Sequence, residues 1–406
     1  MLLKNMNDLN HQASEALNSR RAALGERMVS LEFVRHPELE RRYGEVGREK
    51  CLEDANYHLI YLAQAISVYK VELFVDYIAW AKVMLAKHGV PQMDLAGMLE
   101  TMMESLRLEL PPEFSQLACD FLRVALKQLP QMPDDVPSCM AELNPLAPLA
   151  WQYLQTLLRG ERHTASQLVL DTVQHGTPVR DLYLHVFQPT LYEVGRLWMV
   201  NQISVAQEHY CTAATQLIIS QLYPYILGGE KKRGTLVATC VSGDLHEIGL
   251  RMVTDFFEMD GWHTHYLGAN VPTSSVVQTL IEHEATVLAI SATITYHVRA
   301  VESLIEAVRR APECRSVKIL VGGYPFKVAP DLWRKVGADG FAADAQEAIV
   351  LADRLTNQPL VGGKVEGATE PEAPGTGRPE VCPTKAAITM IIFRTETPRA
   401  KGLWAY

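Results

Sequence analysis

The chain has 406 residues, of which 48% are hydrophobic and 21% are charged, and its net charge is −9. This balance indicates an ordinary folded protein of two or three domains, and it argues against a surface built throughout to bind nucleic acid. Seven cysteines are scattered without a C-x-x-C pair, and no apolar run reaches the roughly 20 residues of a membrane-spanning helix. We therefore expect a cytoplasmic protein that neither spans a membrane nor binds nucleic acid directly.

An N-terminal helical domain is expected over residues 1–140. Apolar residues recur at helical spacing over residues 59–66 and 73–85, and Gly89 with Pro91 ends the second of these helices. Five prolines then fall between residues 130 and 148, which is the composition of a linker. We place the first domain boundary in this proline-rich segment.

Residues 147–228 are expected to form a four-helix bundle. Gly160 and Gly176 end the first two helices, and the S-x-x-Q capping box of Ser204 and Gln207 begins the fourth. Helices joined by such short connections pack antiparallel. The segment therefore predicts a compact bundle between two other domains.

The pattern changes to alternating strands and helices over residues 233–357. Five apolar, β-branched runs are expected as strands, namely residues 235–241, 263–267, 287–291, 319–321 and 340–342. Helix-like segments separate these runs, and this alternation predicts a Rossmann-like, flavodoxin-like doubly wound parallel sheet of five strands. Residues 361–406 are rich in Gly, Pro, Glu and Thr at their start and are expected to be mostly disordered.

Polar residues suited to holding a ligand follow two of these strands. Asp244 and His246 follow the first strand, and Ser291 with Thr293 follows the third. Ligands bind at the carboxyl ends of such strands where the strand order reverses, so one pocket should meet both loops. A histidine that donates one ring nitrogen to a carboxylate keeps the other nitrogen for a metal. The simpler alternative makes Asp244 and His246 polar caps of the next helix.

A three-part pattern across three strand ends resembles the signature of cobalamin-binding domains: Asp244-x-His246-x-x-Gly249, Ser291-x-Thr293 and Gly322-Gly323. The resemblance implies that His246 is the lower axial ligand of cobalt and that Asp244 supports it. It also implies that Gly249 and the glycine pair leave room for the nucleotide tail of the cofactor, and that Ser291 faces the benzimidazole. Thr293 stands where the family usually has leucine.

The predicted bundle carries a second pattern, W-x(9)-E-H, formed by Trp198, Glu208 and His209. It is similar to that of the cobalamin-dependent photoreceptors, a group that includes the photocobilins. The resemblance implies that these three residues line the upper face of adenosylcobalamin. Met199 stands where the light-sensing repressors of this group have a cobalt-binding histidine, so capture of cobalt by that route is in doubt. The alternatives are a core aromatic for Trp198 and a solvated helix face for the other two.

The photoreceptor resemblance predicts a light-responsive cobalamin sensor that is not an enzyme. Loss of the adenosyl group in light would change the conformation or the oligomeric state, so a homo-oligomer, such as a dimer, and a regulatory protein partner are expected. Residues 1–60 hold nine Lys or Arg against ten Asp or Glu, so they present no basic footprint for DNA. The resemblance also implies that the N-terminal helices could hold a bilin, biliverdin, as a second cofactor, or mediate dimerisation. The alternative is a helical core with a few aromatic contacts.

Two alternatives belong to other classes of protein. A corrinoid carrier subunit of a methyltransferase system uses the same bundle and sheet, but it must expose cobalt to its partner. A bulky Trp198 over the corrin would obstruct that exchange, which is why the sensor is the leading prediction. A cofactor-free interaction protein is the third candidate, and it predicts no role for His246.

Overall fold

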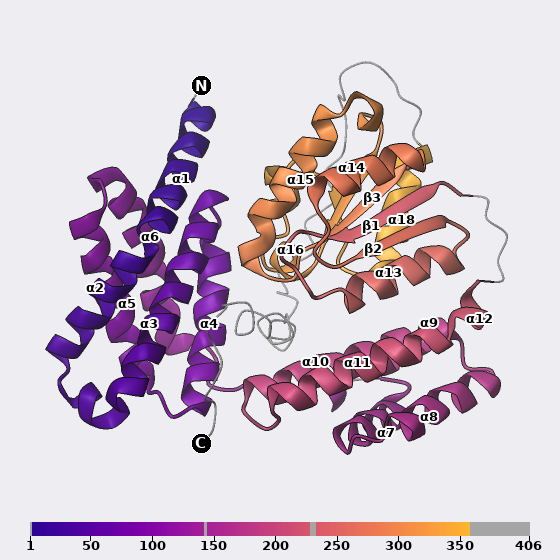
Figure 1. Cartoon of the computed structure of the whole chain (residues 1–406), viewed down its shortest axis with the longest axis horizontal. Coiled ribbons are helices and arrows are strands. Elements are labelled where there is room, and N and C mark those ends of the chain that lie inside the picture. The colour runs from indigo at the N-terminus through magenta and orange to yellow at the C-terminus, as the bar shows by residue number, and fades with distance from the viewer. Residues whose placement is uncertain (1, 142–143, 228–232, 358–406) are drawn as a thin grey trace.

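The computed structural model describes residues 2–141, 144–227 and 233–357. The predicted disordered segment 361–406 lies outside these residues. Figure 1 shows the N-terminal helices on one side of a mixed helix and sheet region, with the helical bundle along another side. The predicted fold class, a five-stranded doubly wound sheet preceded by helices, is confirmed. The division into domains stays a prediction.

Six helices build the N-terminal part: α1 (Leu2–Ser19), α2 (Arg21–Arg35), α3 (Glu38–Ser67), α4 (Val71–Lys87), α5 (Gln92–Glu109) and α6 (Pro112–Gln128). The two predicted apolar runs form the buried parts of α3 and α4. Helix α4 ends just before Gly89, whose φ of +79° lies in the left-handed region that glycine adopts readily. The predicted end of this helix is therefore confirmed.

Short helices η1 (Leu129–Gln131) and η2 (Cys139–Ala141) lead into the bundle, which consists of α7 (Ala147–Leu158), α8 (Arg162–Gln174), α9 (Val179–Leu182), η3 (Tyr183–Phe187), α10 (Gln188–Met199), α11 (Val205–Gln221) and α12 (Tyr223–Ile226). Elements α9, η3 and α10 follow one another without a break, and η3 is a π-helical turn that the sequence did not predict. The capping box that begins α11 is confirmed, because the Ser204 hydroxyl accepts from the backbone N–H of Gln207.

The sheet contains β1 (Thr235–Cys240), β2 (His263–Gly268), β3 (Val287–Ser291), β4 (Lys318–Gly322) and β5 (Gly340–Phe341), all parallel, in the order β2-β1-β3-β4-β5. The connecting helices are α13 (Ile248–Met259), α14 (Thr273–Glu282), η4 (Thr295–His297), α15 (Val298–Arg310), η5 (Pro312–Cys314), α16 (Tyr324–Val328), α17 (Leu332–Lys335) and α18 (Ala345–Asn357). The strand order reverses between β1 and β3, which places the two polar loops side by side.

The two faces of the sheet belong to two different hydrophobic cores. Side chains such as Leu288 and Ile319 pack with α14 and α15 on one face, and this cluster continues into the N-terminal helices. Side chains such as Ala289 and Leu320 lie on the opposite face and pack with α13, α18 and the bundle. Successive residues of a strand point to opposite faces, so neighbours in β3 and β4 serve different cores. One face of the sheet therefore shares a core with the N-terminal helices, and the other face shares a core with the bundle.

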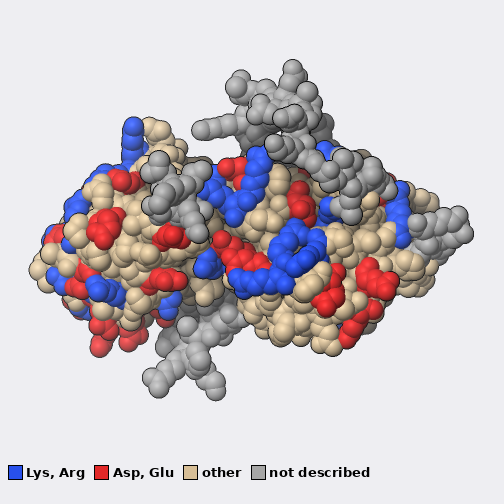
Figure 2. All heavy atoms as spheres, turned by 90° about the horizontal axis from the view of Figure 1, so that it is seen from above, with Lys and Arg blue, Asp and Glu red and all other residues tan. Residues whose placement is uncertain are grey.

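The N-terminal helices also meet the edge of the sheet where the strands end. Helix α3 packs against η4 and α15, and α4 packs against α16 (Figure 1). On the face drawn in Figure 2, Lys and Arg side chains are interspersed with Asp and Glu side chains. Among the helices of the described ranges, none is long and apolar enough to cross a membrane.

Candidate cofactor site

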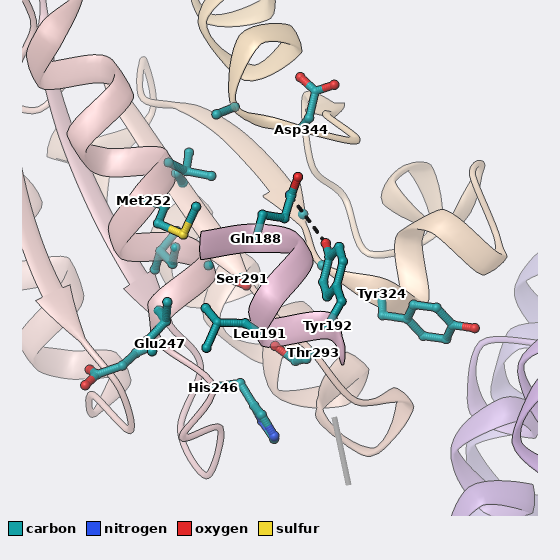
Figure 3. A pocket seen from close by; sticks show the side chains of 18 of the residues that line it. Gln188, Leu191, Tyr192, His246, Glu247, Met252, Ser291, Thr293, Tyr324 and Asp344 are labelled. Atoms are coloured by element: carbon teal, nitrogen blue, oxygen red, sulfur yellow. Dashed lines mark hydrogen bonds between the residues drawn. The ribbon is translucent and has the colours of Figure 1, made fainter. Parts of the chain in front are cut away.

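A cavity of about 700 Å³ lies between the sheet and the bundle (Figure 3). Its walls come from η3, α10 and α11 of the bundle, from the loop that leads into α13, and from the ends of β3 and β4. Apolar side chains such as Met252 and Leu320 line its interior. This volume lies within the range of small-molecule sites, and the cavity opens at the point where the strand order reverses.

The loop after β1 holds Asp244 and His246 in one hydrogen-bonded unit. The Nδ1 atom of His246 lies 2.8 Å from Oδ1 of Asp244, and the backbone N–H of His246 donates to the same oxygen at 3.0 Å. The backbone N–H of Thr293, from the loop after β3, donates to Oδ2 of Asp244 at 2.7 Å. Because a carboxylate accepts, the proton of the imidazole sits on Nδ1, and Nε2 keeps its lone pair.

Asp244 is fully buried yet remains the ionised partner. Burial by itself raises the pKa of the Asp244 carboxyl, but contacts with His246 and His297 outweigh burial and hold that pKa well below its usual range. His297 belongs to η4, and its Nδ1 atom lies 3.5 Å from Oδ2 of Asp244. The carboxylate is therefore charged at neutral pH and keeps His246 in one orientation.

The other ring nitrogen of His246 identifies this loop as a ligand site. Nε2 is buried and has no hydrogen-bond partner among the described residues, although the ring lines the cavity. Figure 3 shows the imidazole extending from the loop beside the cavity. A buried polar atom normally has a partner, and an imidazole lone pair whose other nitrogen donates to a carboxylate has the arrangement of a metal ligand. The residues present thus fit a group that brings its own metal.

Glycines open the cavity beside His246. A Cβ atom built on Gly249 would meet nothing within 4 Å, so a side chain there would extend into the cavity. Gly323 has a φ of +103°, and a Cβ atom on it would lie 2.0 Å from the carbonyl oxygen of Ala292. Gly322 and Ser291 also line the cavity. The space predicted beside Gly249 is therefore present, and the turn after β4 requires a glycine at position 323.

Two of the predicted bundle residues face the same cavity. Glu208 and His209, in the first turns of α11, both line it. His209 Nδ1 contacts the Glu208 carboxylate, and the Thr212 hydroxyl donates to the other oxygen of that carboxylate at 2.8 Å. Glu208 is buried, whereas the side chain of His209 is half exposed. The structure thus brings Glu208 and His209, from α11 of the bundle, to the same cavity as His246.

Trp198 and Met199 lie elsewhere. Trp198 lines a separate cavity of about 40 Å³ with aromatic side chains of α3 and α4, among them Tyr61 and Trp80. Met199 is buried in an apolar cluster that includes Val83. Neither residue lines the large cavity. The turn between α10 and α11 therefore separates Trp198 and Met199 from Glu208 and His209, and a role of Trp198 or Met199 toward a corrin stays a prediction.

Several lining residues were missed by the sequence analysis. Gln188, Leu191 and Tyr192 on α10 line the cavity, and Tyr324 after β4 is part of its wall (Figure 3). The spacing of Gln188, Leu191 and Tyr192 puts them on one helix face, which was a usable signal. The position of Tyr324 depends on the docked N-terminal helices, which the sequence alone does not place.

Comparison with known proteins agrees with this geometry. Two profiles described as B12 binding domain match the chain, one over residues 149–223 and one over residues 234–350. Dimethylamine corrinoid protein 3 of Methanosarcina acetivorans is 31% identical over 166 residues, which is 41% of this chain and 74% of that protein. The chain belongs to the corrinoid proteins.

Solved structures of corrinoid proteins resemble this one in part. The monomethylamine corrinoid protein of Methanosarcina barkeri is 22% identical with a TM-score of 0.47, covering 52% of this chain and 99% of that chain. The methanol:cobalamin methyltransferase complex of the same organism is 19% identical with a TM-score of 0.31, covering 57% and 88%. In the present chain, both ranges that match the B12 binding profiles lie after residue 148.

These findings correct one prediction and confirm another. The predicted binding of a cobalamin is confirmed at the level of the family. The prediction of a light-responsive sensor is wrong, because the matched relatives are dimethylamine corrinoid proteins. The spacing of Trp198, Glu208 and His209 suggested the sensor, yet Trp198 does not line the large cavity. The alternative, a corrinoid carrier, fits the relatives better.

Proposed function

We propose that the protein is a corrinoid carrier subunit of a methyl-transfer system, and that it is not itself the enzyme. The observation that carries the proposal is the buried, unpartnered Nε2 atom of His246, oriented by Asp244. When bound, the corrinoid supplies a cobalt atom that can accept and release a methyl group. The relatives of this chain suggest that the partner is a methyltransferase that acts on a small methylated amine. That partner replaces the regulatory protein expected with a sensor, and the cytoplasm stays the expected location.

In this proposal the residues of the loop after β1 would hold the cofactor. His246 offers Nε2 to cobalt, and Asp244 keeps the proton on Nδ1 and the ring in place. The backbone N–H of Thr293 fixes the carboxylate from the neighbouring loop. The open space beside Gly249 receives the nucleotide tail.

The position of Trp198 also supports a carrier. A carrier must let a partner reach the methyl group, and a tryptophan over the corrin would obstruct that approach. Trp198 instead points toward α3 and α4, where it lines the smaller cavity. Glu208 and His209 present polar groups to the large cavity, and the side chain of His209 is half exposed. We therefore propose that the bound cobalt would carry a methyl group, in place of adenosyl, during function.

The smaller cavity bears on the predicted bilin. Its volume of about 40 Å³ corresponds to a few water molecules, since one water needs roughly 10–15 Å³ on the same measure. A linear tetrapyrrole needs many times that space. We therefore include no bilin in the proposed function, and a biliverdin titration is a control in the experiment below.

The test is a comparison of cofactor binding and methyl transfer in the full-length protein. Cofactor-free protein is titrated in the dark with methylcobalamin, adenosylcobalamin or biliverdin, and the absorption spectrum shows whether an imidazole replaces the cofactor's own base. Bound methylcobalamin is then mixed with a dimethylamine-type methyltransferase and its amine or thiol substrates. Transfer of the methyl group in darkness supports the carrier. Failure to bind any cobalamin, or a change of oligomeric state in light without methyl transfer, overturns it.

A further inference from the structure

The loop after β4 is held from outside the sheet and the bundle. Tyr324 follows the Gly322–Gly323 turn, lines the large cavity and is 8% exposed. Its hydroxyl donates to Oδ1 of Asp76, on α4 of the N-terminal helices, at 2.8 Å. Figure 3 shows the Tyr324 ring directed away from the other labelled side chains and toward the N-terminal helices. A residue of the cavity wall is thus anchored by a carboxylate 248 positions earlier in the chain.

In this contact Tyr324 is the hydrogen-bond donor and Asp76 is the acceptor. Burial and the neighbouring Asp76 carboxylate raise the pKa of Tyr324 well above its usual range, so the hydroxyl keeps its proton and acts as the donor. Burial raises the pKa of Asp76 to about 6, and the hydrogen bond from Tyr324 opposes that rise. At neutral pH the pair is therefore a hydroxyl donating to a carboxylate, which is stronger than a bond between neutral groups.

A second contact joins the N-terminal helices to the same site. Helix α3 packs against η4, which carries His297, and His297 lies 3.5 Å from the carboxylate of Asp244. The N-terminal helices therefore touch the loops after β3 and after β4, and both loops line the cavity. By contrast, the ion pair between Lys70 and Asp331 joins the same two parts of the chain at residues that do not line it.

We propose that the N-terminal helices complete the corrinoid site, and that Asp76 is a positioning residue that fixes Tyr324 and the glycine turn before it. The inference rests on the proposed binding of a corrinoid. Glycine turns have large conformational freedom, and a wall that is fixed before the ligand arrives saves the free energy of ordering it during binding. Neither matched B12 binding range includes Asp76, so this part of the site comes from the N-terminal segment of this chain.

The experiment measures cobalamin affinity in the full-length protein. Cofactor-free protein is titrated with hydroxocobalamin, and binding is followed by the spectral change when an imidazole becomes the lower ligand. Loss of a hydrogen bond to a charged group should weaken binding about tenfold in Asp76→Ala and in Tyr324→Phe. Because Asp76 acts through Tyr324, the double variant should lose no more than either single variant.

Two further variants separate positioning from general structure. Asp76→Asn keeps an oxygen that can accept from Tyr324, so its affinity should stay within about threefold of wild type, since a neutral acceptor loses part of the bond strength. Lys70→Met removes the contact with Asp331 that lies away from the cavity, and its affinity should not change. The circular dichroism melting curve of each variant, recorded without cofactor, identifies any variant that does not fold. If Asp76→Ala fails to fold, Tyr324→Phe and Asp76→Asn still decide the question.

The outcomes are distinguishable. Equal affinity of wild type and a folded Asp76→Ala overturns the inference, and so do losses that multiply to about a hundredfold in the double variant. If wild type binds with an imidazole ligand and His246→Ala does not, while Asp76→Ala is unaffected, this inference fails and the proposed function stands. If wild type binds no cobalamin, both are overturned.

Discussion

Two buried carboxylates support the proposed corrinoid site from different parts of the fold, and their surroundings differ. Asp244, on the sheet side, accepts from two backbone N–H groups and contacts two histidines. Asp76, on the side of the N-terminal helices, accepts from the hydroxyl of Tyr324. Burial acts on both, yet the pKa of Asp244 falls well below its usual range whereas that of Asp76 rises to about 6. The direction of each pKa shift depends on how many hydrogen-bond donors replace the water that the carboxylate loses on burial.

This difference indicates which side of the site is rigid. The donors of Asp244 come from the loops after β1 and β3, and His297 of η4 lies 3.5 Å from the same carboxylate, so several elements surround it. The donor of Asp76 comes from one side chain across the contact between α4 and α16. We therefore expect changes on the sheet side to remove cofactor binding and changes on the N-terminal side to reduce it by smaller factors.

The largest effect is expected for His246→Ala. This change removes the only nitrogen that the loop after β1 offers to cobalt, so the imidazole-ligated spectrum should disappear and the affinity for cobalamin should fall by more than about a hundredfold. The measurement is an absorption titration with hydroxocobalamin. His175→Ala is the matched control, because His175 is exposed at the end of α8 and does not line the cavity. An unchanged spectrum in His246→Ala would remove the basis of the proposed site.

Asp244→Asn is expected to have the next largest effect. An asparagine can still accept from the backbone of Thr293, but it no longer carries the charge that holds the proton on Nδ1 of His246. Changes of this kind behind a metal-bound histidine typically lower affinity by about 10- to 100-fold. The same substitution at Asp76 should cost only about threefold or less. A comparison of the two dissociation constants tests the difference directly, and equal losses would contradict it.

The pH dependence of stability, compared between wild type and Asp76→Asn, tests the Asp76 side of the site. The pKa of Asp76 is about 6 in the folded chain, against about 3.9 when the chain is unfolded, so the folded state binds this proton more tightly. The free energy of unfolding should therefore fall as the pH rises from about 4 to about 6, by roughly 2 to 3 kcal/mol. The difference between wild type and Asp76→Asn in urea unfolding isolates this contribution.

His58 provides an opposing contribution over the same pH range. Burial lowers the pKa of His58 to about 4, so the folded state binds its proton less tightly than the unfolded state does. Its contribution to stability is complete above about pH 6.5 and is lost as the pH falls toward about 4. His58→Gln should remove this loss and should leave the Asp76 contribution in place. If the two variants gave slopes of the same sign, the assigned protonation states would be wrong.

The smallest effect is expected for Trp198→Phe. Trp198 lines the small cavity with α3 and α4 and does not line the large one. Cobalamin affinity and the rate of methyl transfer should therefore stay within about twofold of wild type, because a phenylalanine keeps most of the buried aromatic surface. Methyl transfer from bound methylcobalamin is the measurement. A large change would place this side chain nearer to the corrin than the structure does.

The parts of the site that were predictable from the sequence are those with short-range patterns. Asp244, His246 and Gly249 share one loop, and strand periodicity placed that loop beside Ser291 and Thr293. The contact between Tyr324 and Asp76 joins residues 248 positions apart, so it left no local signal. The direction of Trp198 depends on how α3 and α4 pack against the end of α10. Spacing alone suggested one end of the bundle for Trp198 and Glu208, whereas among the described residues these two side chains line different cavities.

The placement of the sheet between two hydrophobic cores has a consequence for how the protein comes apart. One face shares its core with the N-terminal helices, and the other shares its core with the bundle. A protease that cuts between α6 and α7 would therefore leave two fragments that stay associated, because α3 and α4 keep their contacts with η4, α15 and α16. Such fragments, mixed after separate purification, should reassemble through these contacts between helices.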